Sequence, residues 1–565
     1  MDLFKIDNLN FTYPGNDGHT LNAIDFSVKQ GDFVVLFGAS GSGKTTLLKM
    51  LKPELTPHGE KSGTVLYKGE ALETLDRRIT AREIGYVMQN PETQIVTAKV
   101  WHELAFGLEN LGENPSVIRR KVGEIANYFG INTWFRQKTA ELSGGQKHLL
   151  NLASVLVMEP DVLILDEPTS QLDPIAATNF IHTLEKVNRD FGLTVIMAEH
   201  RLEDVMALAD QVILLEQGTV LLTGSPEGIG EQLKQLDEHH PMIHALPTAA
   251  KVFYGLNFRG DSPLTVREGK QFLTENYDPS VQPEKKEKTK AEPGNVVIEL
   301  KDVWFRYERD LPDVVRGANL TVHEGEVVGV LGGNGSGKTT LLNLMAGQLR
   351  AYRGQVLING KKIQKYSGKE LYRGNIAVLP QDPQALFLKD TVREDYNEIA
   401  KAVGFSKEQL EKRMDVIADQ LDIHHLLEQN PFDLSGGEQQ KAALGKVLLL
   451  EPKILLLDEP TKGMDAFSKE TLANVISRLR RQGLAIVIVT HDIEFAAVVS
   501  DRIGLYFDGE LLAMEPPIEF FSKNHYYTTA ASRMARHLFP QAITWQDIVR
   551  ACEVKESIAY EKALD

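Results

Sequence analysis

The stretch GASGSGKT at residues 38–45 has the glycine spacing and the lysine of a phosphate-binding loop. It recurs as GGNGSGKT at residues 332–339, and the two lysines are 338 − 44 = 294 positions apart. Short apolar runs, Phe33 to Phe37 and Val327 to Leu331, precede the loops. The sequence Thr-Thr-Leu-Leu follows each lysine and is expected to start a helix. Strand, glycine loop and helix form the context in which such a loop binds phosphate. The sequence therefore predicts an α/β fold with tandem P-loop NTPase domains.

Two further motifs repeat at almost the same interval. The sequence LDEP occupies residues 165–168 and 457–460, which places Glu459 at 459 − 167 = 292 positions after Glu167. His491 follows His200 by 491 − 200 = 291 positions. An interval that is nearly constant over a whole repeat indicates a duplicated domain rather than chance matches.

The glycine loops predict nucleotide binding, because backbone N–H groups at a helix N-terminus attract phosphate oxygens. Lys44 and Lys338 are expected to reach the β- and γ-phosphates, and Thr45 and Thr339 to place a hydroxyl on Mg²⁺. The loop residues expected to contact nucleotide are Gly38, Ala39, Ser40, Gly41, Ser42, Gly43, Lys44, Thr45 and Thr46, and Gly332, Gly333, Asn334, Gly335, Ser336, Gly337, Lys338, Thr339 and Thr340.

The acidic pairs follow short, wholly apolar runs that suit strands of a buried parallel sheet. Asp166 and Asp458 are predicted to hold Mg²⁺, directly or through water. Glu167 and Glu459 are predicted to polarise the attacking water as general bases. An isolated Asp-Glu pair usually lies in a solvated turn. Here each pair ends an apolar strand downstream of a P-loop, and this position favours a catalytic role for the pair.

A Ser-Gly-Gly sequence lies 166 − 143 = 23 and 458 − 435 = 23 positions before the two acidic pairs. A serine and two glycines before a helical stretch can form a second anion cradle, although most such sequences are plain loops. The residues of these cradles are Ser143, Gly144, Gly145 and Gln146 in the first half and Ser435, Gly436, Gly437 and Glu438 in the second.

Composition narrows the class of protein. A chain of 565 residues is expected to contain several domains. The formal charge of 62 − 78 = −16 argues against a nucleic-acid binder. The single cysteine, Cys552, excludes an internal disulfide and an all-cysteine metal site. The N-terminal residues lack the apolar core of a signal peptide, and runs such as Leu484 to Val489 are too short to span a bilayer. We therefore expect a soluble chain in a reducing cytosol.

The predicted organisation is two copies of the same plan. Residues 1–235 and 296–523 are the nucleotide-binding domains, each with a β-rich N-terminal subdomain and a helical subdomain that carries the Ser-Gly-Gly sequence. Residues 236–277 and 524–565 are small C-terminal appendices, with helix caps expected at Thr265 and Thr544; two unrelated short helices are the alternative. Residues 278–295 are predicted to be a flexible linker, because lysines and glutamates alternate there with almost no apolar residues, rather than a basic nucleic-acid patch.

The sequence LSGG occurs twice, at residues 142–145 and 434–437, and it is the most specific of these motifs. With these motifs, the chain resembles ATP-binding-cassette (ABC) proteins with two fused nucleotide-binding domains. The resemblance covers nearly the whole chain except the linker. It implies an aromatic that stacks on adenine, a Q-loop glutamine that touches Mg²⁺ and the water, a D-loop aspartate and a switch histidine near the γ-phosphate. The residues at these positions are Tyr13, Gln89, Asp173 and His200 in the first half and Tyr307, Gln381, Asp465 and His491 in the second.

The resemblance also implies two ATP sites formed head to tail, each combining one P-loop with the LSGG of the other half, and an internal pseudo-dimer. Neither half lacks its glutamate or histidine, so two competent sites are expected. Three departures put equal rates in doubt: Glu438 replaces the usual glutamine, Lys147-His148-Leu149 follows the first LSGG, and Ala198-Glu199 precedes the first histidine.

The segment after Gln89, QNPETQIVTAKVWHELAFGLEN, and the sequence TTAASRMARHLFP at residues 528–540 resemble the ATPase subunit of energy-coupling-factor (ECF) importers of vitamins or cobalt and nickel. This implies a peripheral protein at the cytoplasmic face of the membrane. Its partners would be a membrane scaffold subunit with coupling helices and a membrane substrate-binding subunit. Glu103 and Asp395, 395 − 103 = 292 positions apart, are candidates to receive a scaffold arginine, or are solvated helix acids.

Two other classes compete with the importer. A soluble tandem cassette protein that acts on ribosomes or nucleic acid typically has a long basic insert or an iron–sulfur domain, and this chain has a short mixed-charge linker and one cysteine. A non-hydrolysing nucleotide sensor would be expected to have lost a catalytic glutamate or histidine. The sequence does not name the cargo.

Overall fold

The computed structural model describes residues 2–15, 18–277 and 294–553. These form two compact units, Met1–Tyr254 with Arg259–Thr265, and Gly255–Phe258 with Val266–Asp565. Each unit contains a four-stranded and a six-stranded sheet with helices around them. The prediction of two tandem α/β P-loop domains is confirmed. The predicted linker lies almost entirely outside the described residues.

Unit 1 contains one small antiparallel sheet and one larger, mainly parallel sheet. The four-stranded antiparallel sheet has the order β2-β1-β4-β5, and the six-stranded sheet has the order β10-β9-β3-β8-β7-β6. In the latter, β9, β3, β8, β7 and β6 are parallel. Strands β3, β7 and β8 are buried along their whole length and apolar, apart from Thr194 at the start of β8 and the acid that ends β7. The strands are β1 (Asp2–Thr12), β2 (Leu21–Lys29), β3 (Phe33–Phe37), β4 (Glu60–Tyr67), β5 (Glu70–Ala71), β6 (Ile84–Val87), β7 (Val162–Asp166), β8 (Thr194–Ala198), β9 (Gln211–Glu216) and β10 (Thr219–Gly224).

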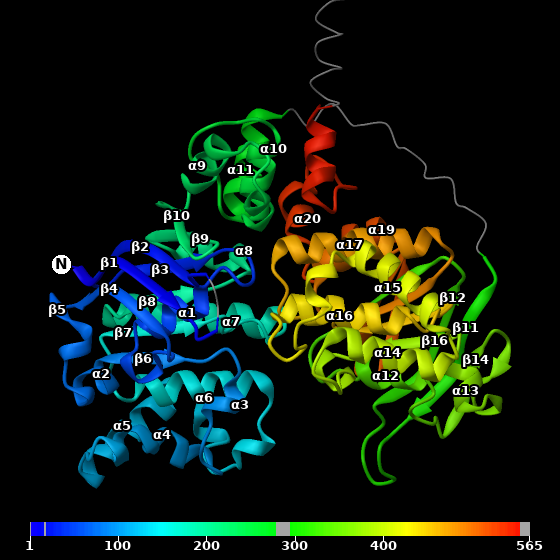
Figure 1. The fold of residues 1–565 in the computed structure, drawn as a ribbon, viewed down its shortest axis with the longest axis horizontal. Helices are drawn as coiled ribbons and strands as arrows, with labels where there is room; N and C mark the ends of the chain where they lie inside the picture. Colours follow the sequence, from blue (N-terminus) through cyan, green and yellow to red (C-terminus); the bar gives the residue numbers. More distant parts are fainter. Residues whose placement is uncertain (1, 16–17, 278–293, 554–565) are drawn as a thin grey trace, which may run out of the picture. The chain divides into compact units, whose positions relative to one another are not determined.

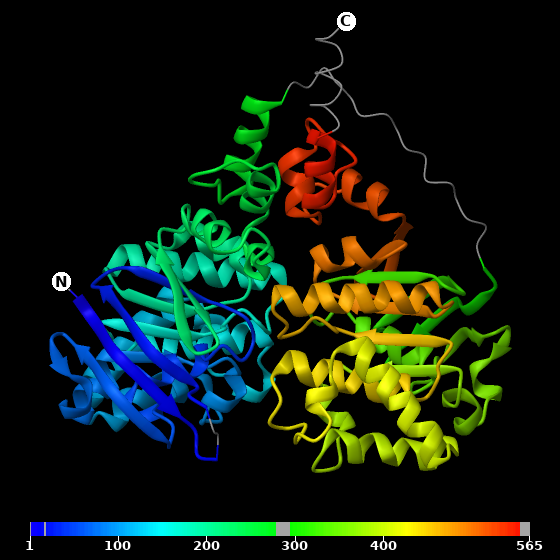
Figure 2. The same ribbon diagram turned by 45° about the horizontal axis from the view of Figure 1, so that its top comes forward.

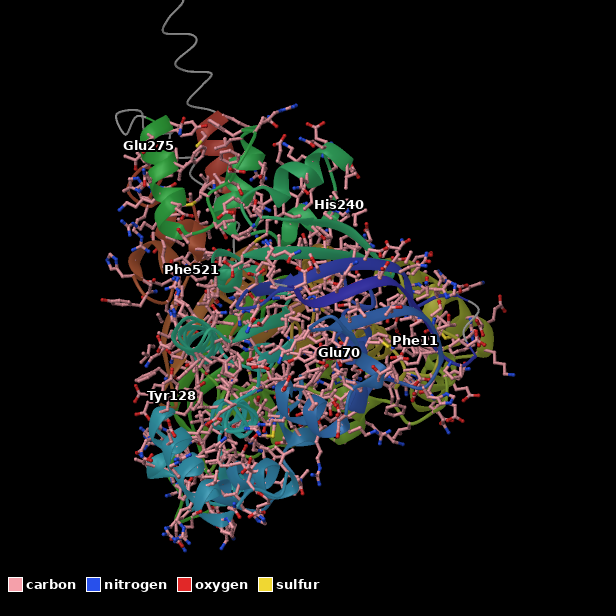
Figure 3. All side chains as sticks on the ribbon, turned by 90° about the vertical axis from the view of Figure 1, so that its left-hand side faces the viewer. Phe11, Glu70, Tyr128, His240, Glu275 and Phe521 are labelled. Carbon is pink, nitrogen blue, oxygen red and sulfur yellow. The ribbon has the colours of Figure 1, made fainter. Side chains whose placement is uncertain are left out.

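The helices of unit 1 divide into those that flank the sheet and a separate helical group. Helices α4, α5 and α6 pack on one another around their own apolar core, and α6 contacts β6 at the edge of the six-stranded sheet (Figure 1). Tyr128 ends α5 in this group, whereas Phe11 lies on β1 (Figure 3). The helices are α1 (Lys44–Met50), α2 (Arg77–Glu83), α3 (Pro91–Gln94), α4 (Val100–Asn110), α5 (Pro115–Tyr128), α6 (Gly144–Leu156), α7 (Pro174–Phe191), α8 (Leu202–Val205), α9 (Ile229–Leu236) and α10 (Thr248–Gly255).

Unit 2 repeats this architecture, with sheet orders β12-β11-β14-β15 and β16-β17-β18-β13-β19-β20. Its helical group is α14, α15 and α16, drawn in yellow and yellow-green (Figure 2). The strands are β11 (Val296–Phe305), β12 (Val315–His323), β13 (Val327–Leu331), β14 (Arg353–Ile358), β15 (Lys361–Lys362), β16 (Ile376–Leu379), β17 (Ile454–Asp458), β18 (Ala485–Thr490), β19 (Arg502–Phe507) and β20 (Glu510–Glu515). The helices are α11 (Val266–Asn276), α12 (Lys338–Met345), α13 (Gly368–Tyr372), α14 (Val392–Val403), α15 (Lys407–Leu421), α16 (Gly436–Leu448), α17 (Ala466–Arg481), α18 (Ile493–Val499), α19 (Pro517–Lys523) and α20 (Ala530–Ala535).

Helix α11, from the first predicted appendix, belongs to unit 2 and packs against α20. Thr274 Oγ1 lies 2.9 Å from His537 Nε2 across this contact. The predicted cap at Thr544 is present, because the Asp547 amide donates to Thr544 Oγ1 at 3.2 Å and the Thr544 amide donates to Asp547 Oδ2 at 3.0 Å. Over the described ranges, no helix is both long enough and apolar enough to cross a bilayer.

Candidate nucleotide-binding site

Each P-loop ends at a glycine that caps the following helix. Gly43 and Gly337 have φ values of 100° and 105°, a left-handed conformation that favours glycine. A Cβ atom would lie 3.0 Å from the Thr20 carbonyl oxygen at Gly43 and 2.9 Å from Val314 Cγ1 at Gly337. Backbone conformation and space therefore both require glycine here, and α1 and α12 begin at the next residue with their amides exposed at the N-terminus.

The P-loop lysines fold back over their own loops. Lys44 Nζ donates to the carbonyl oxygens of Gly38 at 3.0 Å and Ala39 at 2.9 Å. Lys338 Nζ makes the same contacts with Gly332 at 2.9 Å and Gly333 at 3.0 Å. Both lysines are at most 5% exposed. Each loop therefore presents a positive charge beside its row of backbone amides, which suits a polyphosphate.

The aspartates at the ends of β7 and β17 form the candidate metal positions. Thr45 Oγ1 donates to Asp166 Oδ1 at 3.0 Å, and Tyr86 donates to Asp166 Oδ2 at 3.3 Å. Burial, followed by the charge of Glu167, raises the pKa of Asp166 to about 6. Burial also raises the pKa of Asp458 to about 6, and its Oδ1 is buried without a hydrogen-bond partner. A buried carboxylate next to a threonine hydroxyl fits a divalent cation.

In the first half, Glu167 contacts both the candidate Q-loop glutamine and the candidate switch histidine. Gln89 Nε2 donates to Glu167 Oε2 at 2.8 Å, and His200 Nε2 lies 2.7 Å from Glu167 Oε1. Glu167 has a φ of 45°, which is unusual for a residue other than glycine. The structure thus brings the glutamine, the glutamate and the histidine of the first half together.

The second half resembles the first but is not identical to it. Glu459, with a φ of 49°, accepts from the Thr490 hydroxyl at 3.1 Å and the His491 amide at 3.2 Å, and His491 Nδ1 lies 2.8 Å from Glu459 Oε2. Burial opposes ionisation, but the contacts with His491 and the charge of Lys338 outweigh it and lower the pKa of Glu459. Gln381 is exposed, and in the described part of the chain no hydrogen bond joins it to Glu459.

The remaining predicted residues cap or flank these helices. The Tyr13 hydroxyl lies 3.3 Å from Thr46 Oγ1, and the Tyr307 hydroxyl lies 3.0 Å from Thr340 Oγ1. Each of these threonines is the second residue after the P-loop lysine. Ser143 and Ser435 cap α6 and α16 through capping boxes with Gln146 and Glu438. Asp173 and Asp465 cap α7 and α17, accepting from the amides of Ala176 at 2.9 Å and Ser468 at 2.7 Å. The first turn of a helix has backbone N–H groups without intrahelical partners, which an anion cradle needs.

The expectation for Glu103 and Asp395 is wrong in both of its forms. Glu103 is 4% exposed and accepts from the Thr97 amide at 2.8 Å. Asp395 is 0% exposed, lies 2.7 Å from Lys446 Nζ and accepts from the Leu388 amide at 3.1 Å. Both acids are buried because they satisfy backbone amides of the segment that follows the Q-loop glutamine. They are neither solvated nor available to a partner's arginine.

Sequence reasoning also missed two residues that contact the acids described above, Tyr86 and Lys446. Tyr86, in the apolar strand β6, reads as a core residue, yet its hydroxyl reaches Asp166. Lys446 lies in the last turn of α16 and reads as an exposed helix lysine, yet it pairs with the buried Asp395. The neighbours of Tyr86 in β6 are all apolar, so its hydroxyl has no side-chain partner nearby in the sequence. This is the one signal in the sequence that indicates a contact with a distant segment.

Two P-loops, each with an acidic strand end, a histidine and an LSGG helix cap, define a P-loop nucleotide hydrolase. The profile of the ABC transporter family matches residues 21–170 and 315–462. A relative in Bacillus thuringiensis subsp. konkukian (strain 97-27), provisionally named an ABC transporter ATP-binding protein, is 40% identical over 97% of this chain and 98% of its own. The chain therefore belongs to the ABC transporter family and is an ATP-binding ATP hydrolase.

A solved structure of an archaeal protein has a similar fold. The archaeal ribosome recycling factor aABCE1, solved in complex with archaeal ribosomal stalk protein aP1, matches with a TM-score of 0.57 and 21% identity over 91% of both chains. The cbiO1 protein from Clostridium perfringens, part of the ABC transporter complex cbiONQ, is 29% identical, with 40% of this chain and 92% of its own covered and a TM-score of 0.38. The likeness to aABCE1 shows the fold alone, and the TM-score of the cbiO1 match is too low for any conclusion about this chain.

Proposed function

We propose that this chain is the energy-coupling ATPase of an ECF-type importer for a vitamin or metal ion, held at the cytoplasmic face of the membrane by a scaffold subunit. The observation that carries the proposal is a pair of exposed apolar side chains in the segments after the Q-loops. Val96 is 62% exposed and Leu388 is 82% exposed, and they are equivalent in the repeat, at 388 − 96 = 292 positions apart.

The backbone beneath each of these side chains is held by a buried acid. The Val96 amide lies 3.2 Å from Glu103 Oε2, and the Leu388 amide lies 3.1 Å from Asp395 Oδ1. Trp101 and Phe106 of α4 add apolar exposure of 39% and 38% in the first half. A supported segment with an exposed apolar tip suits docking of an apolar partner surface, such as the coupling helix of a membrane subunit.

For the chemistry, we propose that Glu167 and Glu459 take the proton of the attacking water while the bond from the γ-phosphorus to the β,γ-bridging oxygen breaks, which gives ADP and phosphate. Mg²⁺, held by Thr45 with Asp166 and by Thr339 with Asp458, would neutralise charge on the phosphates. Gln89, Gln381, His200 and His491 would orient the water and the γ-phosphate. The sequence motifs and the family resemblance support completion of each site by the LSGG of the other half.

The docking proposal predicts that a Val96→Glu, Leu388→Glu variant loses membrane retention and uptake by at least about tenfold, because two charges replace apolar contact area. Its ATP binding should be unchanged, since both side chains are exposed and both P-loops keep their residues. The measurement is the fraction of protein sedimenting with membranes, and substrate uptake in cells. An Ile79→Glu, Val416→Glu variant is the matched control, because these side chains are 42% and 55% exposed elsewhere in the two halves. Retention equal to that of the control would contradict the proposal.

The alternative is a soluble tandem ATPase that acts on ribosomes. The likeness to aABCE1 is the observation that favours it, and that likeness extends to the fold only. Sedimentation of the unaltered chain with ribosomes rather than membranes would support this alternative.

A further inference from the structure

Strand β6 leads directly into Gln89, and it is the last strand in the order of its six-stranded sheet. The side-chain amide of Gln94 binds the backbone at the end of this strand. Its Nε2 donates to the Tyr86 carbonyl oxygen at 3.0 Å, and its Oε1 accepts from the Met88 amide at 2.9 Å. A carbonyl and an N–H two residues apart on a sheet edge are the groups that a neighbouring strand would bind. Gln94 therefore takes the place of a strand beside the peptide that carries Gln89.

A buried asparagine supports Gln94 from helix α6, which begins after the first LSGG serine. Asn151 is 0% exposed, and its Nδ2 donates to the Pro91 carbonyl oxygen at 3.2 Å and lies 3.5 Å from Gln94 Oε1. Gln94 itself is half-buried. Connected hydrogen bonds of partly buried amides hold their side chains in one orientation. Gln94 thus joins the peptide before Gln89 to the segment that carries the exposed Val96.

The second half has different residues at both ends of this contact. Leu386 stands at the position of Gln94, since 386 − 94 = 292, and Pro380 stands at the position of Met88, since 380 − 88 = 292. A leucine side chain has no donor or acceptor, and a proline has no N–H to donate. The Leu386 carbonyl oxygen instead accepts from Lys446 Nζ of α16. The same segment is therefore held by a different element in each half.

The two Q-loop glutamines differ in parallel with these contacts. Gln89 Nε2 donates to Glu167 Oε2 at 2.8 Å. Gln381 is exposed, and within the described residues no hydrogen bond joins it to Glu459. A side chain keeps a defined contact only when its own backbone is held in place, and a small displacement of a group near the reacting atoms costs much of its effect.

We propose that Gln94 is a positioning residue that fixes the peptide before Gln89 and thereby holds Gln89 against Glu167, an arrangement that the second half lacks. The inference rests on the proposed role of Gln89 in orienting the attacking water. It also gives the first half a route of control. Because Gln94 and Val96 belong to one short segment, a partner that binds at Val96 acts on Gln89 through Gln94.

The test isolates the first half in a Glu459→Gln background. Gln94→Leu introduces the residue that the second half has, and we expect kcat per ATP-binding site to fall about three- to tenfold while KM changes less than about twofold, because two hydrogen bonds are lost away from the P-loop. In the ATP-free chain, the Met88 amide should exchange its hydrogen faster, since its acceptor is gone. Gln235→Leu, which removes an exposed glutamine of α9, is the matched control and should change neither quantity.

A double-mutant cycle decides whether Gln94 acts through Gln89. In the same background, Gln89→Ala should lower kcat at least as much as Gln94→Leu does. Adding Gln94→Leu to Gln89→Ala should then have no further effect, because the side chain that Gln94 positions is absent. Effects that multiply would mean that Gln94 supports only the fold, and this result would overturn the inference.

Two further outcomes separate this inference from the proposed role of Gln89. If Gln89→Ala lowers kcat but Gln94→Leu leaves kcat or the exchange of the Met88 amide unchanged, the inference about Gln94 is wrong and the role of Gln89 stands. If Gln89→Ala hydrolyses ATP normally, the role of Gln89 is wrong, and the inference fails with it.

Discussion

Replacement of both Glu167 and Glu459 by Gln is expected to reduce ATP hydrolysis by about 10²- to 10⁴-fold, the usual cost of losing a general base. The amide of glutamine has nearly the same shape as the carboxylate but cannot take the proton of water. ATP binding should persist, because the P-loop amides and lysines are unchanged. The measurement is steady-state phosphate release alongside nucleotide affinity.

The control for this experiment is Glu408→Gln. Glu408 pairs with Lys412 on the surface of α15, where its side chain is 82% exposed, so the same chemical change there should leave hydrolysis unaltered. Substantial turnover in the double variant, with the control normal, would remove Glu167 and Glu459 from the role of base.

Replacement of Lys44 and Lys338 by Met is expected to weaken ATP binding at each half by about 10- to 150-fold. The lost contact is a charge-assisted hydrogen bond to phosphate, which contributes about 1.5–3 kcal/mol. Methionine keeps the apolar stem of the side chain, so the fold around each loop should survive. Equilibrium binding of a fluorescent ATP analogue to each single variant measures the effect.

Lys412→Met removes a lysine of the second half from an exposed pair and serves as the control. Affinity of the Lys44→Met and Lys338→Met variants equal to that of Lys412→Met would contradict the assignment of the two loops as phosphate-binding sites.

Local sequence rules predict much of this molecule. The P-loop glycines, the buried apolar strands and the N-caps at Ser143 and Ser435 depend on residues close together in the chain, so their spacing predicts their conformation. The same rules place Asp166 and Glu167 at a strand end. The tandem arrangement follows from the repeat itself, because a constant interval between motifs requires no knowledge of the fold.

The properties that sequence reasoning missed depend on contacts between distant segments. Glu103 and Asp395 look like exposed helix acids, and only the fold shows that loop amides, and Lys446 for Asp395, surround them. Likewise, the sequence shows that Glu199 differs from Thr490, but not that their side chains engage different acceptors and donors. Burial of a charged group requires partners, and its partners here come from other elements.

These corrections change where a partner is expected to act. The buried acids hold the segments after the Q-loops from inside, and Val96 and Leu388 are exposed apolar side chains of these segments. A docking partner would therefore meet these apolar groups rather than the carboxylates of Glu103 and Asp395. Partner-induced movement of these segments would pass to Glu103 and Asp395 first, since each is bound to the segment's backbone.

The most direct test of the importer assignment is purification of the unaltered, tagged chain from its native membranes in mild detergent, with quantification of the proteins that accompany it. The account predicts stoichiometric recovery of integral membrane subunits, one of them with cytoplasmic coupling helices, and loss of these subunits in the Val96→Glu, Leu388→Glu variant. Recovery of the chain from the soluble fraction with ribosomal proteins, and without membrane subunits, would contradict it.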